Sequence, residues 1–169
     1  VSALAKQTFR DGGDGDPRLE AFHQRLVALA EANEIGVSGK PQAPGLRDLV
    51  ERITSPYRQG GSVVVSGENV PVPARVAVAI GMTLHELSTN AVKYGALSQS
   101  GRVLIDWKTE AGRLRLTWRE VDGPPVIAPS HTGFGTRLIE RGMPGAAGGT
   151  AELEFNPAGV VCRLDMPLR

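Results

Sequence analysis

The chain has 169 residues, of which 41% are hydrophobic and 22% are charged, a composition that suits one folded domain with a short helical extension and argues against wholesale disorder. Its 19 Lys and Arg residues against 18 Asp and Glu residues give a net charge of +1, which argues against a protein that coats nucleic acid or an anionic membrane. The single cysteine, Cys162, cannot form an internal disulfide, and the apolar run over residues 70–84 is too short and too interrupted to span a bilayer. We therefore expect a soluble protein of a reducing compartment.

The first 36 residues have the pattern of two helices joined by a turn. Residues 1–9 favour a helix but carry no N-cap, so we interpret them as the end of a longer helix, and the Gly- and Asp-rich residues 11–17 predict a turn. Apolar residues then recur in steps of three, four and three, which is one helical face: Leu19, Phe22, Leu26 and Leu29. We predict that residues 1–36 are the remnant of a helical hairpin, and that a Gly-, Pro- and Ser-rich loop separates it from a second unit over residues 45–169.

The second unit alternates helical and strand patterns. We expect a short helix over 46–57, a strand over 62–66, and a long helix that starts at Pro73. Strands over 102–107 and 113–120 follow, joined by a turn at 109–112; a Pro-rich loop over 122–132, a short helix over 135–141 and strands over 151–155 and 160–166 complete the chain. This order predicts an α+β two-layer sandwich, with helices on one face of a mixed sheet. The strand over 113–120 alternates apolar and polar residues cleanly, which is typical of an antiparallel sheet with one solvated face.

The long helix carries a row of polar residues beside its apolar stripe. Glu86, Asn90 and Lys93 are spaced four and three apart, so they share one helical face. This row suits a magnesium-bound polyphosphate, because Asn90 can ligate the metal, Glu86 can hold a metal-bound water, and Lys93 can reach a phosphate. Any one of these residues alone would more readily be part of a solvated helix face. His85 and Glu86 also match the start of a zinc-protease helix, but Thr89 stands where the second His is required, which excludes that site.

Two later segments could complete a nucleotide pocket. Glu120 has the strand parity of Trp118, so we expect it on the core-facing side with a hydrogen-bond partner, such as the exocyclic amine of adenine. The alternative is that Glu120 simply ends the strand in water. Gly133 and Gly135 lead into a helix, whose free backbone N–H groups could bind phosphate, although most such glycine pairs are plain turns. The order of the chain fits neither a P-loop nor a Rossmann fingerprint.

The residues over 84–98 (LHELSTNAVKYGALS), 118–120 (WRE) and 133–141 (GFGTRLIER) resemble the HWE family of bacterial sensor histidine kinases. That family takes its name from a His and a Trp-x-Glu, here His85, Trp118 and Glu120. The resemblance implies the Bergerat ATP-binding fold, ATP and Mg²⁺ as cofactors, phosphorylation of a His, and transfer of the phosphate to an Asp of a response-regulator receiver domain. The phosphoacceptor string of the family would precede Val1, so we expect this chain to bind nucleotide without phosphorylating itself.

The resemblance also implies roles for individual residues. Asn90 would ligate Mg²⁺, Glu86 and His85 would assist phosphoryl transfer, and Glu120 would bind adenine. The remaining implied ATP contacts are Lys93, Tyr94, Asp122, Gly123, Gly133, Phe134, Gly135 and Thr136. The chain departs from the family pattern at Asp122, where a Gly is common, and at residues 33–34, where Asn-Glu replaces a His-Asp-like pair.

The function that this resemblance implies is the catalytic domain of a histidine kinase in the bacterial cytoplasm. We expect the parent protein to form a homodimer through the helical hairpin, with no nucleic-acid partner and no membrane contact from this part of the chain. The alternative is a non-catalytic nucleotide-binding module that acts by protein contact alone. His23, off the apolar stripe of its helix, is interpreted as a surface residue, and His131 as a loop residue that could touch phosphate.

Overall fold

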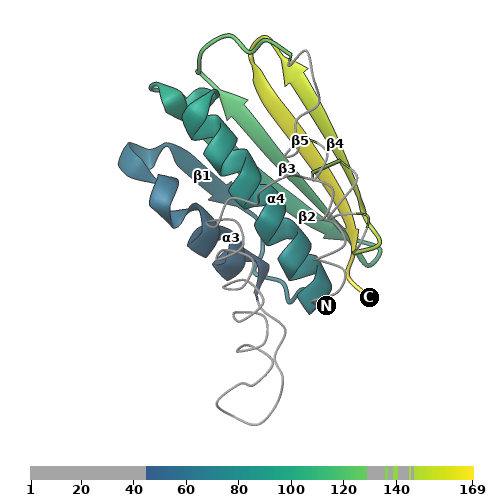
Figure 1. Ribbon diagram of the computed structural model, residues 1–169. Coiled ribbons are helices and arrows are strands. Elements are labelled where there is room, and N and C mark those ends of the chain that lie inside the picture. The colour runs from purple at the N-terminus through teal and green to yellow at the C-terminus, as the bar shows by residue number, and fades with distance from the viewer. Residues whose placement is uncertain (1–44, 129–135, 137–138, 141–144, 146) are drawn as a thin grey trace, which may run out of the picture.

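The computed structural model describes residues 45–128, 136, 139–140, 145 and 147–169. In this part of the chain, a five-stranded sheet is covered on one face by two α-helices, α3 and α4 (Figure 1). The expected α+β two-layer sandwich is therefore confirmed. The expected helical hairpin over residues 1–36, and most of the expected helix over 135–141, lie outside the described residues.

Helix α3 (Leu46–Thr54) buries one apolar face against α4 and strand β1 (Val63–Ser66). Its buried apolar residues are Leu46, Leu49, Val50 and Ile53, the spacing of a single helical stripe. The α-helix ends earlier than the predicted residue 57, because Pro56 has no backbone N–H to continue the hydrogen-bond ladder of the helix. Residues Ser55–Tyr57 continue instead as a 3₁₀ turn, followed by a second such turn at Gln59–Gly61.

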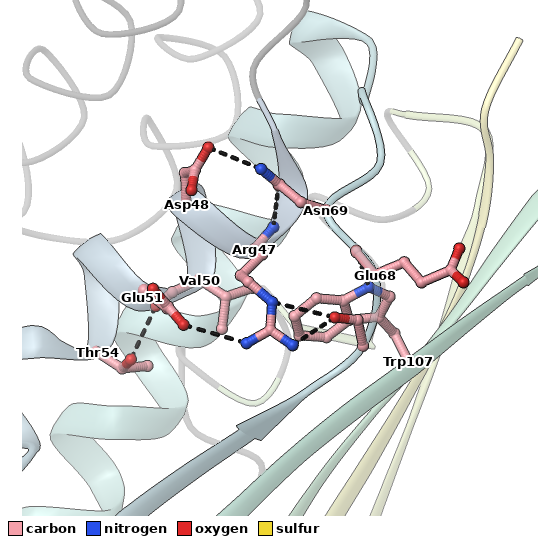
Figure 2. Close-up of polar contacts among 9 residues, drawn as sticks. Arg47, Asp48, Val50, Glu51, Thr54, Glu68, Asn69 and Trp107 are labelled. Atoms are coloured by element: carbon pink, nitrogen blue, oxygen red, sulfur yellow. Dashed lines mark hydrogen bonds and ion pairs between the residues drawn. The ribbon is translucent and has the colours of Figure 1, made fainter.

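The first turn of α3 is tied to a distant part of the chain. The Arg47 guanidinium donates to the carbonyl of Gly67 from both Nε (3.1 Å) and Nη2 (2.5 Å), and it lies 5.8 Å from the ring centroid of Trp107 (Figure 2). The indole of Trp107 in turn donates to the carbonyl of Glu68 at 2.9 Å. The side chain of Asn69 accepts the Arg47 backbone N–H at 3.0 Å, which supplies a helix N-terminal partner that Gly45 cannot provide.

Helix α4 (Ala74–Lys93) is the long helix predicted from residue 73 onward, and Pro73 is its N-cap residue. Its apolar stripe packs into the core between the helices and the sheet, with Ile80, Leu84 and Ala91 fully buried. The short 3₁₀ turn Ala96–Ser98 follows and leads the chain back to the sheet. Residues 86–93, which carry the predicted polar row, therefore form the C-terminal half of a helix that is held along its length by the core.

The sheet has the strand order β1-β2-β3-β5-β4 and is mixed, as expected. Strand β1 pairs parallel with β2 (Arg102–Glu110). The other strands are β3 (Arg113–Val121), β4 (Thr150–Asn156) and β5 (Gly159–Pro167). The pairs β2 with β3, β3 with β5, and β5 with β4 are all antiparallel. The predicted end of β2 at residue 107 and the predicted four-residue turn are wrong. The strand continues to Glu110, and the turn is the pair Ala111 and Gly112, with φ of 50° and 74°. Positive φ at both residues is what the type I′ turn of a two-residue hairpin requires.

The two faces of the sheet differ as the alternation of β3 predicts. Leu114, Leu116 and Trp118 are buried beneath the helices. The outer face is polar and carries ion pairs that include Arg113 with Asp165 at 2.5 Å and Arg163 with Glu154. Because both signs of charge are interleaved there, this face suits contact with water and leaves the helix side of the sheet as the place for a binding site.

Candidate nucleotide site

The polar row on α4 contains one direct contact between its members. Asn90 Nδ2 donates a hydrogen bond to Glu86 Oε1 at 3.2 Å, across one helical turn, and both side chains are half-buried. Because the nitrogen of the Asn90 amide faces Glu86, its oxygen Oδ1 is the group that could take a metal ion. Lys93 lies one turn further along and is exposed, and Tyr94, the C-cap residue, is 76% exposed. The structure thus places Glu86, Asn90 and Lys93 along the C-terminal part of α4 and Tyr94 at its C-cap.

His85 lies next to this row and is half-buried. Burial lowers the pKa of its imidazole below the ordinary value of 6.5, and the adjacent Glu86 charge acts in the opposite direction. The first cause is the larger, so neutral His85 is favoured at neutral pH. A neutral imidazole has one nitrogen that accepts and one that donates, so it can move a proton or orient a neighbouring group.

Glu120 is buried at the end of β3, with only 4% of the residue exposed. Its Oε2 accepts the backbone N–H of Ala96 at 2.7 Å, and its Oε1 accepts the indole N–H of Trp118 at 3.4 Å. Burial raises the pKa of this carboxyl above 4.5, and the two hydrogen bonds partly oppose that shift. The alternative that Glu120 ends the strand in water is therefore wrong, and the core-facing position expected from strand parity is confirmed.

The turn after α4 reaches directly to Glu120. A Cβ atom at Gly95 would lie 2.1 Å from Glu120 Oε2, so only a residue without a side chain allows this approach. A Cβ atom at Gly123 would lie 2.5 Å from the Cα of Ala96, which brings the loop after β3 against the same turn. The end of the polar helix and the end of β3 therefore meet at the buried carboxylate. Sequence reasoning missed Gly95 and Ala96, because a backbone donor and a close approach leave no side-chain signal.

Asp122 follows β3 with a φ of 58°, a left-handed conformation that Asp tolerates better than most residues. Its carboxylate is exposed and accepts from Arg102 at 2.7 Å (Nη2) and 3.2 Å (Nε), so in this structure it pairs with the start of β2. Gly123 is half-buried beside it. Thr136 is also half-buried, whereas Gly133, Phe134 and Gly135 lie outside the described residues, as do His23 and His131.

The described residues contain no group of three or more His, Cys, Asp or Glu side chains that could hold a metal ion. Asn90 is the metal ligand predicted from the sequence, and it does not depend on such a group. Among the helices in this part of the chain, none is long and apolar enough to cross a membrane.

Comparison with known proteins gives relatives of one kind. The family model "HWE histidine kinase" matches residues 1–69. Blue-light-activated histidine kinase 1 of Erythrobacter litoralis (strain HTCC2594) is 36% identical over 176 residues, which cover 99% of this chain and 49% of that protein. Blue-light-activated histidine kinase of Brucella anthropi is 31% identical over 175 residues, which cover 99% of this chain and 36% of that protein. The chain thus spans half the length, or less, of these curated relatives.

Several solved structures with the same fold are histidine kinase domains. The histidine kinase domain of the Erythrobacter litoralis EL346 blue-light activated histidine kinase superposes with a TM-score of 0.70 at 23% identity, covering 99% of this chain and 85% of that chain. The catalytic domain of histidine kinase ThkA superposes with a TM-score of 0.57 at 19% identity, covering 73% and 92%. The described part of the chain therefore has the fold of a histidine kinase catalytic domain. The family match and the curated relatives likewise are histidine kinases, and the chain is similar to the HWE histidine kinase family.

Proposed function

We propose that this chain is the ATP-binding catalytic region of a sensor histidine kinase, which transfers the γ-phosphate of Mg-ATP to a histidine for relay to an aspartate of a response regulator. The observation that carries the proposal is the meeting of the polar end of α4 with the buried carboxylate of Glu120. One end of this arrangement offers an acceptor for a base, and the other offers groups for a metal and phosphates. Within the chain we assign residues 45–169 to this catalytic domain and residues 1–36 to a dimerisation hairpin.

Asn90 is the proposed ligand for Mg²⁺, through Oδ1. Protein-bound Mg²⁺ commonly uses one or two protein oxygens and completes its shell with phosphates and water, and Asn90 Oδ1 would be one such oxygen. When bound, the ion would neutralise charge on the transferring phosphoryl group. Glu86 holds the Asn90 amide in place through the 3.2 Å hydrogen bond, and the exposed Lys93 could extend toward a phosphate.

Glu120 is the proposed acceptor for the exocyclic N6 amine of adenine. Each carboxylate oxygen can accept two hydrogen bonds, so the contacts to Ala96 and Trp118 leave acceptor capacity on both. Guanine presents the acceptor O6 at the corresponding position, and two facing acceptors cost about 1–3 kcal/mol. The site should therefore prefer ATP over GTP by roughly tenfold or more. Tyr94, Asp122, Gly123, Gly133, Phe134, Gly135 and Thr136 are proposed as further nucleotide contacts.

Phosphoryl transfer in this proposal depends on positioning and electrostatics. Glu86 and His85 lie on adjacent positions of α4, where a carboxylate and a neutral imidazole can orient the attacking histidine or carry its proton. The attacking histidine comes from outside the described residues. A response-regulator receiver domain is the proposed acceptor of the phosphate. The proposed dimer partner is a second copy of the parent protein, and the proposed compartment is the bacterial cytoplasm.

Substitution Asn90→Ala tests the metal assignment. We expect Asn90→Ala to weaken Mg-ATP binding at least tenfold, as measured by isothermal titration calorimetry, and to leave metal-free ATP binding in EDTA nearly unchanged. The matched control is Asn156→Ala, an exposed asparagine at the end of β4 that bonds only weakly, at 3.4 Å, to Glu154. Equal Mg-ATP affinity in Asn90→Ala and wild type would refute the assignment.

The enzymatic part of the proposal needs a separate test. Incubation of the parent protein with γ-labelled ATP should give an acid-labile, base-stable phosphoprotein, as expected for phosphohistidine. Residues 1–169 alone should bind ATP and remain unlabelled. Binding of ATP by the parent protein without any labelling would favour the non-catalytic module instead.

A further inference from the structure

Among the described residues, Trp118 is the one whose side chain donates a hydrogen bond to the buried carboxylate of Glu120. Trp118 and Glu120 are two positions apart on β3, so both point to the helix-covered face of the sheet. Trp118 has no exposed surface, and its indole Nε1 lies 3.4 Å from Glu120 Oε1. A side chain so completely covered cannot contact a nucleotide directly. Any effect of Trp118 on the ligand must therefore pass through the residues that it contacts, and Glu120 is its hydrogen-bond partner.

The two donors on Glu120 define the orientation of its carboxylate. Ala96 N–H binds Oε2 and Trp118 Nε1–H binds Oε1, so each oxygen has a separate fixed partner. None of the ion pairs found among the described residues includes Glu120, so these donors provide the main polar support for its charge. With one donor removed, the carboxylate can rotate about its terminal bond, because that torsion is broad for Glu. The direction of the remaining acceptor sites would then no longer be fixed.

We propose that Trp118 is a positioning residue for base recognition: its indole N–H, together with the backbone N–H of Ala96, holds the Glu120 carboxylate so that one acceptor site points toward the exocyclic amine of the base. This inference rests on the proposed function, in which Glu120 receives the N6 amine of adenine. It goes further by assigning part of the base selectivity to a buried residue that does not touch the nucleotide.

The test compares ATP with purine riboside triphosphate, which lacks the 6-amino group and is otherwise the same ligand. For wild type we expect ATP to bind at least tenfold more tightly, since the amine donates to a charged acceptor. Trp118→Phe keeps an aromatic ring in the core and removes the donor. This selectivity should then fall by roughly fivefold, the equivalent of one typical hydrogen bond. Both affinities are measured by calorimetry on the 169-residue chain.

Trp107→Phe is the matched control. Trp107 is also buried, with 4% exposure, and it also donates a single indole hydrogen bond, to the carbonyl of Glu68 at 2.9 Å. Trp107→Phe should lose about as much stability as Trp118→Phe and keep the wild-type preference for ATP over purine riboside triphosphate. Equal loss of selectivity in both variants would mean a general loosening of the core and would overturn the positioning role. If Trp118→Phe does not fold, 3-benzothienylalanine at position 118 keeps the shape of the bicyclic ring and replaces the N–H by sulfur.

A double-mutant cycle separates positioning from packing. In the Glu120→Ala background, Trp118→Phe should change the selectivity no further, because the group that it positions is gone. A further loss in that background would overturn the inference, as would unchanged selectivity in Trp118→Phe alone. If wild type binds both triphosphates equally well, the adenine role of Glu120 is itself wrong. The failure of the proposed function and the failure of this inference therefore give different results.

Discussion

The buried carboxyl of Glu120 should give the fold a distinctive dependence on pH. Burial raises its pKa above 4.5 in the folded state, so between pH 4.5 and that raised value the folded protein binds a proton that the unfolded chain has released. Stability contributed by this group is therefore present at low pH and is lost as the pH rises. One carboxyl binds one proton, so the slope contributed by Glu120 cannot exceed about 1.4 kcal/mol per pH unit.

Glu120→Gln removes this titration while keeping an amide oxygen that can accept the Ala96 N–H at the position of Oε2. We expect the free energy of unfolding of wild type, relative to Glu120→Gln, to fall as the pH rises from 4.5 through the raised pKa and then to level off. The measurement is urea denaturation of both proteins from pH 4 to 8. The variant should also lose affinity for ATP, because it replaces a charged acceptor by a neutral one.

Glu154→Gln is the control with the opposite sign. The hydrogen bond from Arg163 is the main cause that lowers the pKa of Glu154, and a second one from Asn156 acts in the same direction. Its contribution to stability is therefore lost as the pH falls through the lowered pKa. A difference between wild type and Glu120→Gln that stays flat, or that grows with pH as for Glu154→Gln, would refute the reasoning about the buried carboxyl.

Two further predictions concern single backbone positions. Gly95→Ala should weaken ATP binding at least fivefold in calorimetry, because the new Cβ would lie 2.1 Å from Glu120 Oε2 and displace the carboxylate. The control is Gly149→Ala, whose Cβ would meet Met166 Sδ at 2.4 Å beside Leu114, at the opposite end of β3 from Glu120. This control should strain the fold without the loss of affinity, and equal ATP affinities in the two variants would contradict the prediction. Ala111→Asn should raise the free energy of unfolding by about 1 kcal/mol in urea denaturation, because residue 111 has a φ of 50° and Asn-Gly favours this turn. Gly112→Ala, at a φ of 74°, should lower the free energy of unfolding. A destabilised Ala111→Asn would show that the turn does not limit stability.

The parts of the structure that could be predicted are those with a local signal. The apolar stripe of α4 and its start at Pro73 follow from helical periodicity, and the burial of Glu120 follows from its strand parity with Trp118. The sequence does not reveal the two-residue turn, because Ala111 is an unusual residue in the left-handed region. Of the residues that usually mark this turn, such as Asn-Gly, only Gly112 is present.

The remainder depends on contacts between distant segments. Ala96 meets Glu120 across 24 residues of sequence, and Gly95 lies next to it. Neither residue has a side chain whose chemistry would indicate the contact. Arg47 is a similar long-range case, because its guanidinium reaches Gly67 and Trp107 only when α3 is packed against β1. Such contacts arise from the packed fold, and periodicity or motif spacing gives no sign of them.

The anchoring of Arg47 also changes how the short helix α3 can open. Helix ends fray because their backbone groups lack partners, and a nine-residue helix such as α3 would ordinarily open from both ends. Here the first turn is held by Asn69, by the Gly67 carbonyl and by the ring of Trp107, three groups that belong to the strand–helix connection and to β2 (Figure 2). Release of the Arg47 end therefore requires the neighbouring connection to open with it. Hydrogen exchange along α3 should thus follow a gradient, with the slowest amides in the turn nearest residue 45.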